Sequence, residues 1–237
     1  MNIAYLFHGH ARTWELCYEN FFKNVYSVIP GDIFIHTWDR INAFSGSHWN
    51  AWQENLKDTD ISNNVINLKG ILETYKPTNI LIEKDKGINS FKEKLPYVSN
   101  SHLGAKNMLS SCLTVFNMAK QYKKYDKFFS TRMDINYLTK FEKNELLSEE
   151  LLIGKTNYDE KYPYIFDIWS VGSEKQFETK TNYINHIDNY WYNYGIDLHS
   201  HVYEAALKKY YDDTGIIVKR SNIEYCAPRI TGEITYW

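Results

Sequence analysis

The chain is poor in cysteine, proline and glycine: its 237 residues include 3 Cys, 5 Pro and 11 Gly. The cysteines Cys17, Cys112 and Cys226 are far apart and contain no CxxC pair. This spacing indicates neither a disulfide framework nor a zinc finger, and a reducing compartment fits it best. No linker, internal repeat or low-complexity tract interrupts the sequence, so we expect one compact domain spanning residues 1–237.

Charge of one sign and long hydrophobic runs are also scarce. The 27 Lys+Arg against 29 Asp+Glu give a net charge of −2, and without a basic stripe this balance argues against nucleic acid as a partner. No apolar run approaches the ~18 residues that cross a bilayer. The first apolar run breaks at His8-Gly9-His10 with no basic region before it, so we expect no signal peptide. The expected location is the cytoplasm, with partners holding the protein at the inner face of the membrane at most.

What is abundant is aromatic surface. Hydrophobic residues make up 43% of the chain and charged ones 24%, which predicts a packed globular core. The 20 Tyr, 12 Phe and 7 Trp amount to 16%, and sugar rings and nucleobases both stack on such side chains. An AT-rich genome explains most of the excess, because Asn and Lys are abundant too. Composition therefore does not distinguish between these ligands.

Hydrophobic periodicity predicts alternating strands and helices. The first forty residues form a βαβ unit with strands at 3–7 and 32–37 and a helix whose N-cap is Thr13. The fold class we expect is α/β, with a mainly parallel central sheet flanked by helices. Further strands are expected at 79–83, 125–131, 151–154, 164–172 and 216–218, and further helices at 62–75, 101–122, 174–192 and 201–211.

The ends of these strands are where ligands bind in open parallel sheets. After the first strand, Gly9, Arg12 and Thr13 combine a flexible residue, a cation and a helix amino terminus, which together can bind an anion. The glycine spacing is that of neither a Walker nor a Rossmann motif. An ordinary strand-to-helix turn is therefore the alternative.

A second candidate follows the strand centred on Phe128 and Phe129, which ends in Arg132-Met133-Asp134. Residues i and i+2 of an extended chain point the same way. Arg132 could hold a diphosphate while Asp134 holds a divalent metal. The alternative is a surface ion pair that contributes less than ~1 kcal/mol.

Two other patterns suggest metal binding. Asp58 and Asp60 form an Asp-x-Asp motif, but the stretch around them is polar and follows no apolar strand, so we interpret it as a solvated loop. His8, His10 and His36 at two strand ends could form the zinc-like site of a hydrolase. Hydrolases with such a site are eight-stranded barrels, for which this chain has too few predicted strands.

Five segments, in this order and spacing, resemble a family of bacterial and viral glycosyltransferases with the GT-A fold that build lipopolysaccharide and capsule. The resemblance extends over about the first 175 residues. The segments are Ile3–Thr13, Asp32–Trp38, Tyr75–Glu83, Tyr125–Ile135 and Asp167–Ser173.

The resemblance implies a single GT-A-like, Rossmann-like domain in which residues of about 1–135 bind a nucleotide sugar and about 136–237 bind the acceptor. It also implies a divalent cation, Mn²⁺ or Mg²⁺, held by an Asp-x-Asp motif. Here Arg132 stands in place of the first carboxylate, so Asp134 is the implied metal ligand and Arg132 is expected to compensate part of the charge. The implied nucleotide-sugar-binding residues are Gly9, Arg12, Thr13, His36, Thr37, Trp38, Asp39, Arg132 and Asp134.

The predicted activity is transfer of a sugar from a nucleotide diphosphate sugar to a glycan or lipid-linked glycan acceptor. An inverting enzyme needs a carboxylate to take the acceptor's proton. Asp167 is the first candidate, with acceptor binding or strand capping as its other interpretation, and Glu204 is the second. Trp169, Tyr190, Trp191 and Tyr192 are candidates for an acceptor platform, or for core residues.

Two other functions remain open at this point. One is the metal-dependent hydrolase using His8, His10 and His36. The other is a non-catalytic carbohydrate-binding protein, an interpretation encouraged by the missing first carboxylate of the metal motif. The configuration at the transferred sugar, the sugar itself and the nucleotide base are not specified by these residues.

Overall fold

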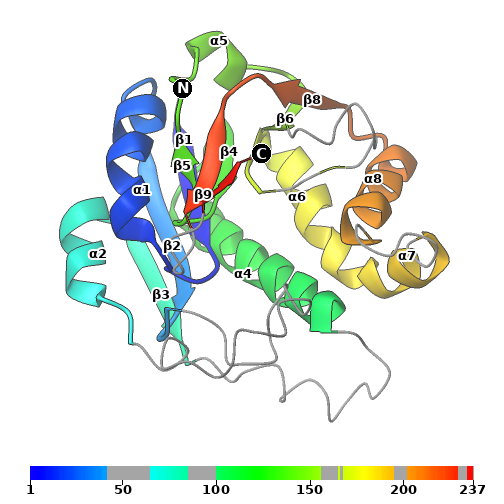
Figure 1. Cartoon of the computed structure of the whole chain (residues 1–237). Coiled ribbons are helices and arrows are strands. Elements are labelled where there is room, and N and C mark those ends of the chain that lie inside the picture. Colours follow the sequence, from blue (N-terminus) through cyan, green and yellow to red (C-terminus); the bar gives the residue numbers. More distant parts are fainter. Residues whose placement is uncertain are drawn as a thin grey trace.

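The structure is a computed structural model that describes residues 1–41, 65–84, 100–155, 165, 168–194, 202–228 and 234–236. Figure 1 shows its helices and strands. The strands are β1 (Ile3–His8), β2 (Asp32–Trp38), β3 (Asn79–Glu83), β4 (Lys127–Thr131), β5 (Asn136–Tyr137), β6 (Leu151–Gly154), β7 (Ser170–Gly172), β8 (Val218–Ser221), β9 (Tyr225–Pro228) and β10 (Ile234–Tyr236). The helices are α1 (Trp14–Phe21), α2 (Leu68–Tyr75), α4 (Asn100–Tyr122), α5 (Lys143–Leu146), α6 (Glu174–Asn182), α7 (Ile187–Tyr194) and α8 (Val202–Thr214), with a π-helical turn at Phe22–Tyr26 and a 3-10 turn at Tyr183–Asn185.

Seven of the strands form a central sheet in the order β3-β2-β1-β4-β7-β6-β8. The first four are parallel to one another. β7 is antiparallel to both of its neighbours, and β6 is parallel to β8. The chain is therefore an α/β protein with a mostly parallel sheet flanked by helices, as the sequence predicts, and it is compatible with a Rossmann-like domain.

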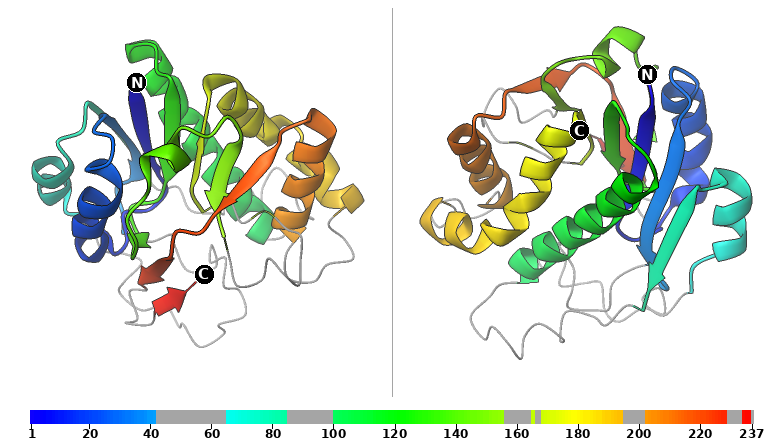
Figure 2. Two further views of the ribbon diagram at one scale, coloured as in Figure 1. Left: turned by 90° about the horizontal axis from the view of Figure 1, so that it is seen from above. Right: turned by 180° about the vertical axis from the view of Figure 1, so that it is seen from behind.

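Both faces of the sheet are covered. Along β1, Tyr5 and Phe7 belong to the core under α1 and α2, whereas Ala4 and Leu6 belong to the core under α4 and α6. Figure 2 shows α4 lying across one face and α1 on the other. Burial on both faces explains why β1 is an apolar run rather than an alternating one, and every residue of β4 is buried too.

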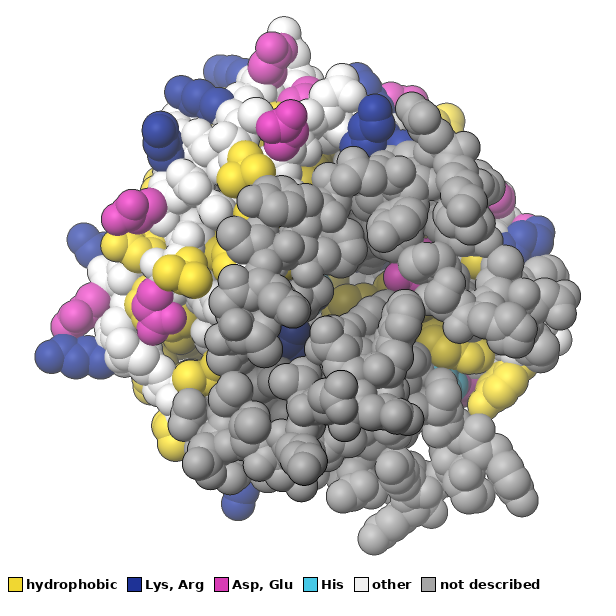
Figure 3. Space-filling model, viewed as in Figure 1, with side chains coloured by type: hydrophobic (Ala, Val, Ile, Leu, Met, Phe, Trp, Pro, Cys, Tyr) yellow, Lys and Arg dark blue, Asp and Glu magenta, His cyan; other side chains and the backbone are white. Residues whose placement is uncertain are grey.

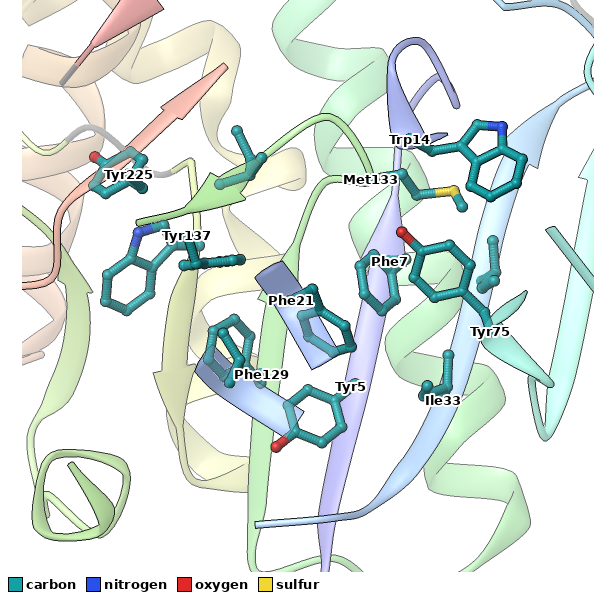
Figure 4. Close-up of a cluster of buried hydrophobic side chains, with 14 of the residues drawn as sticks. Tyr5, Phe7, Trp14, Phe21, Ile33, Tyr75, Phe129, Met133, Tyr137 and Tyr225 are labelled. Atoms are coloured by element: carbon teal, nitrogen blue, oxygen red, sulfur yellow. The ribbon is translucent and has the colours of Figure 1, made fainter. Parts of the chain in front are cut away.

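The core on the α1 and α2 side is largely aromatic (Figure 4). The ring of Phe7 lies 4.9 Å from that of Phe21 and 5.0 Å from that of Tyr75, both edge to face. Tyr5 packs in the same cluster and donates its hydroxyl proton to the carbonyl of Ile29 at 2.5 Å. Much of the aromatic excess is thus core, where it packs edge to face.

A small second sheet, in the order β10-β9-β5, brings the end of the chain back to its beginning. β9 is antiparallel to β5, which follows β4 closely in the chain. The carbonyl of Pro228 in β9 accepts a 2.8 Å hydrogen bond from the hydroxyl of Thr13, just before α1. Three segments that are distant in sequence therefore meet beside the end of β1.

The sequence-based predictions agree with most of these elements and need several corrections. The helix predicted at 62–75 begins only at Leu68, because the Asn67 side chain accepts from the Gly70 N–H and caps it there; residues 62–64 lie outside the described part. Thr13 does occupy the N-cap position of α1, but its side chain makes no capping hydrogen bond and binds Pro228 instead. Local propensity carries no information about such a distant partner.

The other corrections concern the second half of the chain. The helix predicted at 174–192 is divided by the 3-10 turn into α6 and α7, and the strand at 216–218 lies instead at Val218–Ser221. Of the strand predicted at 164–172, residues 164, 166 and 167 lie outside the described part, and Ser170–Gly172 form β7. β5, β9 and β10 were not predicted, because strands of two to four residues carry too short a pattern.

Candidate functional site

The strand order reverses beside β1, since β2 and β3 lie on one side of it and β4 on the other. In doubly wound sheets a ligand binds at this switch point, in the crevice beyond the carboxyl ends of the strands. Here those ends are His8 of β1 and Thr131 of β4. Figure 3 shows hydrophobic, basic and acidic side chains near the middle of this face of the molecule.

Gly9 directly follows β1 and faces open space. Its φ is +96°, a conformation that side-chain-bearing residues rarely adopt, and a Cβ built on it would meet no atom within 4 Å. Its N–H donates to the hydroxyl of Ser111 on α4 at 3.1 Å. The glycine is thus required by the backbone turn, and it lets the main chain border the switch point without a side chain in front of it.

Arg12, Arg132 and Asp134 come together beside this turn. The Nε of Arg132 donates to Asp134 Oδ1 at 2.8 Å and its Nη2 donates to Oδ2. Arg12 Nη1 lies 3.9 Å from the same Oδ2. The Asp134 side chain is 1% exposed, whereas those of Arg132 and Arg12 are 24% and 26% exposed. Two partly accessible cations therefore converge on one buried carboxylate.

The described side chains do not fit a metal ion at Asp134. Magnesium and calcium need several oxygen ligands, but no group of three or more His, Cys, Asp or Glu in the described ranges could hold a metal. Both oxygens of Asp134 already accept hydrogen bonds from Arg132. A dication there would also lie next to two guanidinium groups. Asp134 as a metal ligand remains a prediction without support from these neighbours.

A buried polar cluster lies beneath the switch point and was missed by sequence reasoning. Lys180 of α6 is 2% exposed and donates to Ser170 Oγ at 2.7 Å and to Ser130 Oγ at 3.4 Å. Ser130 also lies 2.9 Å from Nε2 of His8. The signal was present in the sequence: Lys180 follows the buried Phe177 by three residues, which places a cation on the apolar face of the helix.

The pKa of the His8 imidazole is held well below its usual value, first by burial and then by the positive charges of Lys180 and Arg132. The pKa of His10 is lowered to about 3, by burial and by the charge of Arg12. Both imidazoles are therefore neutral at pH 7. Burial is the main cause of both shifts, and the neighbouring cations act in the same direction.

The end of β2 supplies a second group of predicted residues. Nδ1 of His36 lies 2.6 Å from Ser111 Oγ, and its Nε2 lies 3.3 Å from Glu83. Burial lowers the pKa of His36, although Glu83 opposes this shift. The ring of Trp38 lies 4.5 Å from that of His10. Thr37, which lies between His36 and Trp38 in the sequence, is fully buried.

The backbone of Asp39 is hydrogen-bonded at both its N–H and its carbonyl. Its N–H donates to Glu83 O at 2.9 Å and its carbonyl accepts from Ile66 N–H at 3.2 Å. These bonds continue the pairing of β2 with β3 beyond Trp38. The predicted set is thus distributed over the ends of three neighbouring strands, β2, β1 and β4. Within it, Arg12 and Arg132 both lie beside Asp134.

The three histidines of the hydrolase alternative have separate partners. His8 contacts Ser130, His36 contacts Ser111 and Glu83, and Nδ1 of His10 lies 3.3 Å from the carbonyl of Arg40. His8 and His36 are direct neighbours on adjacent strands. Since no metal-binding group of three is found among the described residues, this arrangement gives the hydrolase no support.

Of the two proposed catalytic carboxylates, Glu204 lies in the described part of the chain. Asp167 lies outside the described residues, as do Asp58 and Asp60 of the other Asp-x-Asp motif. Glu204 is on α8, which lies near β8 and α7 (Figure 1). It is 6% exposed, and burial raises its pKa to about 7.

The expected aromatic platform is wrong for Trp169. This side chain is fully buried and stacks on Phe129, with the ring centroids 5.8 Å apart. Tyr190, Trp191 and Tyr192 belong to α7, where Trp191 packs 4.7 Å from the ring of His102. Of these three, Tyr192 is the most exposed, at 44%.

Comparison of the sequence with protein-family models gave no match, and comparison with curated proteins gave none either. None of the helices in the described part of the chain has the length and apolar character that crossing a bilayer requires.

Proposed function

We propose that the protein is a GT-A-like glycosyltransferase that moves a sugar from a nucleotide diphosphate sugar to a glycan or lipid-linked glycan acceptor. Its cytoplasmic substrates would be intermediates of lipopolysaccharide or capsule. The observation that carries the proposal is the convergence of Arg12, Arg132 and the open backbone of Gly9 at the switch point of the sheet.

The charges at this point suit a diphosphate. Arg12 and Arg132 outnumber Asp134, and the buried Lys180 adds a further positive charge behind them. Guanidinium groups bind phosphate oxygens through paired N–H donors. Gly9 leaves room for a ligand to approach the main chain. A diphosphate bound here would compensate the excess positive charge.

The same charges would assist the transfer. The bond between the anomeric carbon and the diphosphate oxygen breaks, and its electron pair stays on the departing nucleoside diphosphate. The acceptor hydroxyl oxygen forms the new bond to that carbon and gives up its proton to a base. Cations placed beside the leaving group stabilise its developing negative charge, which lowers the barrier.

The transfer also needs a base that takes the proton of the acceptor hydroxyl. Asp167 remains the first candidate on sequence grounds alone. Glu204 has a pKa of about 7, which suits proton transfer near neutral pH, but it lies on α8, away from β1 and β4 (Figure 1). Glu204 would therefore act as the base only for an acceptor that reaches α8.

The proposal is tested by incubating the purified protein with a panel of UDP-, GDP-, CDP-, ADP- and dTDP-sugars and measuring release of the nucleoside diphosphate. Release from one nucleotide class, accelerated by an added acceptor glycan, is the expected result. Arg12→Met should lower it by tenfold or more. Lys143→Met is the matched control, because Lys143 is exposed on α5, near the amino end of β1 (Figure 1).

Two outcomes would contradict the proposal. Glycan binding without binding of any nucleotide would favour a non-catalytic carbohydrate-binding protein. Hydrolysis of phosphate esters or amides in the presence of zinc, without nucleotide binding, would favour the hydrolase.

A further inference from the structure

We propose that this site binds the diphosphate of its donor without a divalent cation, Arg132 and Arg12 supplying the positive charge and Asp134 positioning them. This inference rests on the proposed function and concerns how the same site works. It departs from the expectation of Mn²⁺ or Mg²⁺ at the carboxylate of Asp134.

The geometry of Arg132 leaves it able to bind a ligand while it is held. Asp134 takes the Nε and Nη2 edge of the guanidinium. No hydrogen bond among the described residues uses the Nη1 group, and the side chain is 24% exposed. A guanidinium fixed along one edge presents its remaining donors in a set direction, which favours a phosphate oxygen over water.

Asp134 is poorly placed to be a metal ligand and well placed to orient the arginines. Its side chain is 1% exposed, and its Oδ2 faces both Arg132 and Arg12. A metal ion could reach these oxygens only by displacing Arg132. Even then, the positive charge of Arg12, 3.9 Å from the same oxygen, would offset the negative charge of Asp134 that attracts the metal.

The surroundings also favour an anion over a cation. Lys180 lies under the end of β4, bonded to Ser130, and its charge reaches the imidazole of His8. His8 and His10 are neutral and could in principle be metal ligands. One nitrogen of each already contacts a protein group, however: Ser130 Oγ for His8 and the Arg40 carbonyl for His10. Two guanidinium groups and one ammonium group therefore lie around the single carboxylate of Asp134.

The test uses the unmodified protein, so that no variant has to fold. We would measure the dissociation constants of UDP, GDP, CDP, ADP and dTDP by calorimetry, first in EDTA and then with about 1 mM Mn²⁺ in place of EDTA. Mn²⁺ binding without nucleotide would be followed by electron paramagnetic resonance of the free ion. The expected result is one nucleotide whose affinity in EDTA and in Mn²⁺ agrees within about threefold, and no tight Mn²⁺ site.

Affinity that falls tenfold or more in EDTA and returns with Mn²⁺ would overturn the inference while supporting the proposed function. Absence of binding by every nucleotide under both conditions would overturn both. The two failures are thus distinguishable in one experiment.

Substitutions then identify the cations. Arg132→Met should weaken binding of that nucleotide tenfold or more in EDTA, and Arg132→Lys should recover only part of it, because the ammonium cannot hold Asp134 and a phosphate at once. Lys143→Met should leave the affinity unchanged. If Arg132→Met left the affinity in EDTA unchanged while circular dichroism showed a folded protein, Arg132 would not be the cation and the inference would fail.

Discussion

The guanidinium of Arg132 holds the carboxylate of Asp134 along one edge, through Nε at 2.8 Å and through Nη2, although the two residues are only two positions apart. The turn after β4 makes this possible, because it brings the arginine side chain back over the aspartate. The aspartate is buried and the arginine partly exposed. A buried carboxylate thus fixes the position of a partly exposed guanidinium at the switch point.

We expect Asp134→Asn to lower the free energy of unfolding by about 2–3 kcal/mol, because it removes charge-assisted hydrogen bonds and leaves Arg132 without its counter-ion. Urea denaturation measures this. The control is Asp212→Asn, which breaks an exposed i,i+4 pair with Lys208 and should change stability by no more than about 0.5 kcal/mol. Equal effects of the two substitutions would show that the buried pair contributes no more than a surface one.

Replacing two glycines should have opposite effects on stability. An alanine Cβ would meet no atom within 4 Å at either Gly9 or Gly104. Gly9→Ala should be destabilising by about 1–2 kcal/mol, because its φ of +96° strains any side-chain-bearing residue. Gly104→Ala, within α4, should be stabilising by about 0.5–1 kcal/mol. Thermal unfolding of both variants checks this, and a stable Gly9→Ala protein would mean that the turn after β1 can relax.

His8 should make the protein less stable as the pH falls. Its pKa is lowered in the folded state by burial and by Lys180, whereas an unfolded histidine titrates near 6.5. Below that pH the unfolded chain binds one more proton, so stability is lost by up to about 1.4 kcal/mol per pH unit for this group. Urea denaturation between pH 7.5 and 5.5 should show a smaller loss for His8→Gln than for the unchanged protein.

The control for this substitution is His186→Gln, because His186 is an exposed histidine whose ring stacks on Tyr210 at the surface. Its pH profile should follow that of the unchanged protein. The same slope in His8→Gln would mean that His8 is not held neutral in the folded state.

Glu204 should have the opposite pH dependence. Burial raises its pKa from 4.5 to about 7, so the folded state binds more protons between these values and stability is lost as the pH rises through them. Glu204→Gln should therefore resemble the unchanged protein at pH 4.5 and be more stable by up to about 3 kcal/mol at pH 8. Denaturation at the two pH values measures the difference, with the exposed Glu224→Gln as control. A constant difference would exclude titration of Glu204 as its cause.

The sequence by itself determined the fold class and most of the sheet. The strands at 3–7, 32–37 and 79–83 were predictable because they are apolar or β-rich runs bounded by polar turns, and such local patterns survive in the folded protein. The strand-end argument also identified Arg12, Arg132 and Asp134, since the ends of parallel strands meet at one edge.

What only the tertiary structure decided is which of these groups touch and how their charges are shared. Local spacing could not show that both arginines converge on Asp134, that Thr13 binds Pro228, or that Lys180 is buried beneath the site. It also left Trp169 as a candidate for the surface, where the structure buries it. The physical reason is that these contacts join residues up to 215 positions apart, and the burial and electrostatic field they create depend on the packed neighbours rather than on adjacent residues.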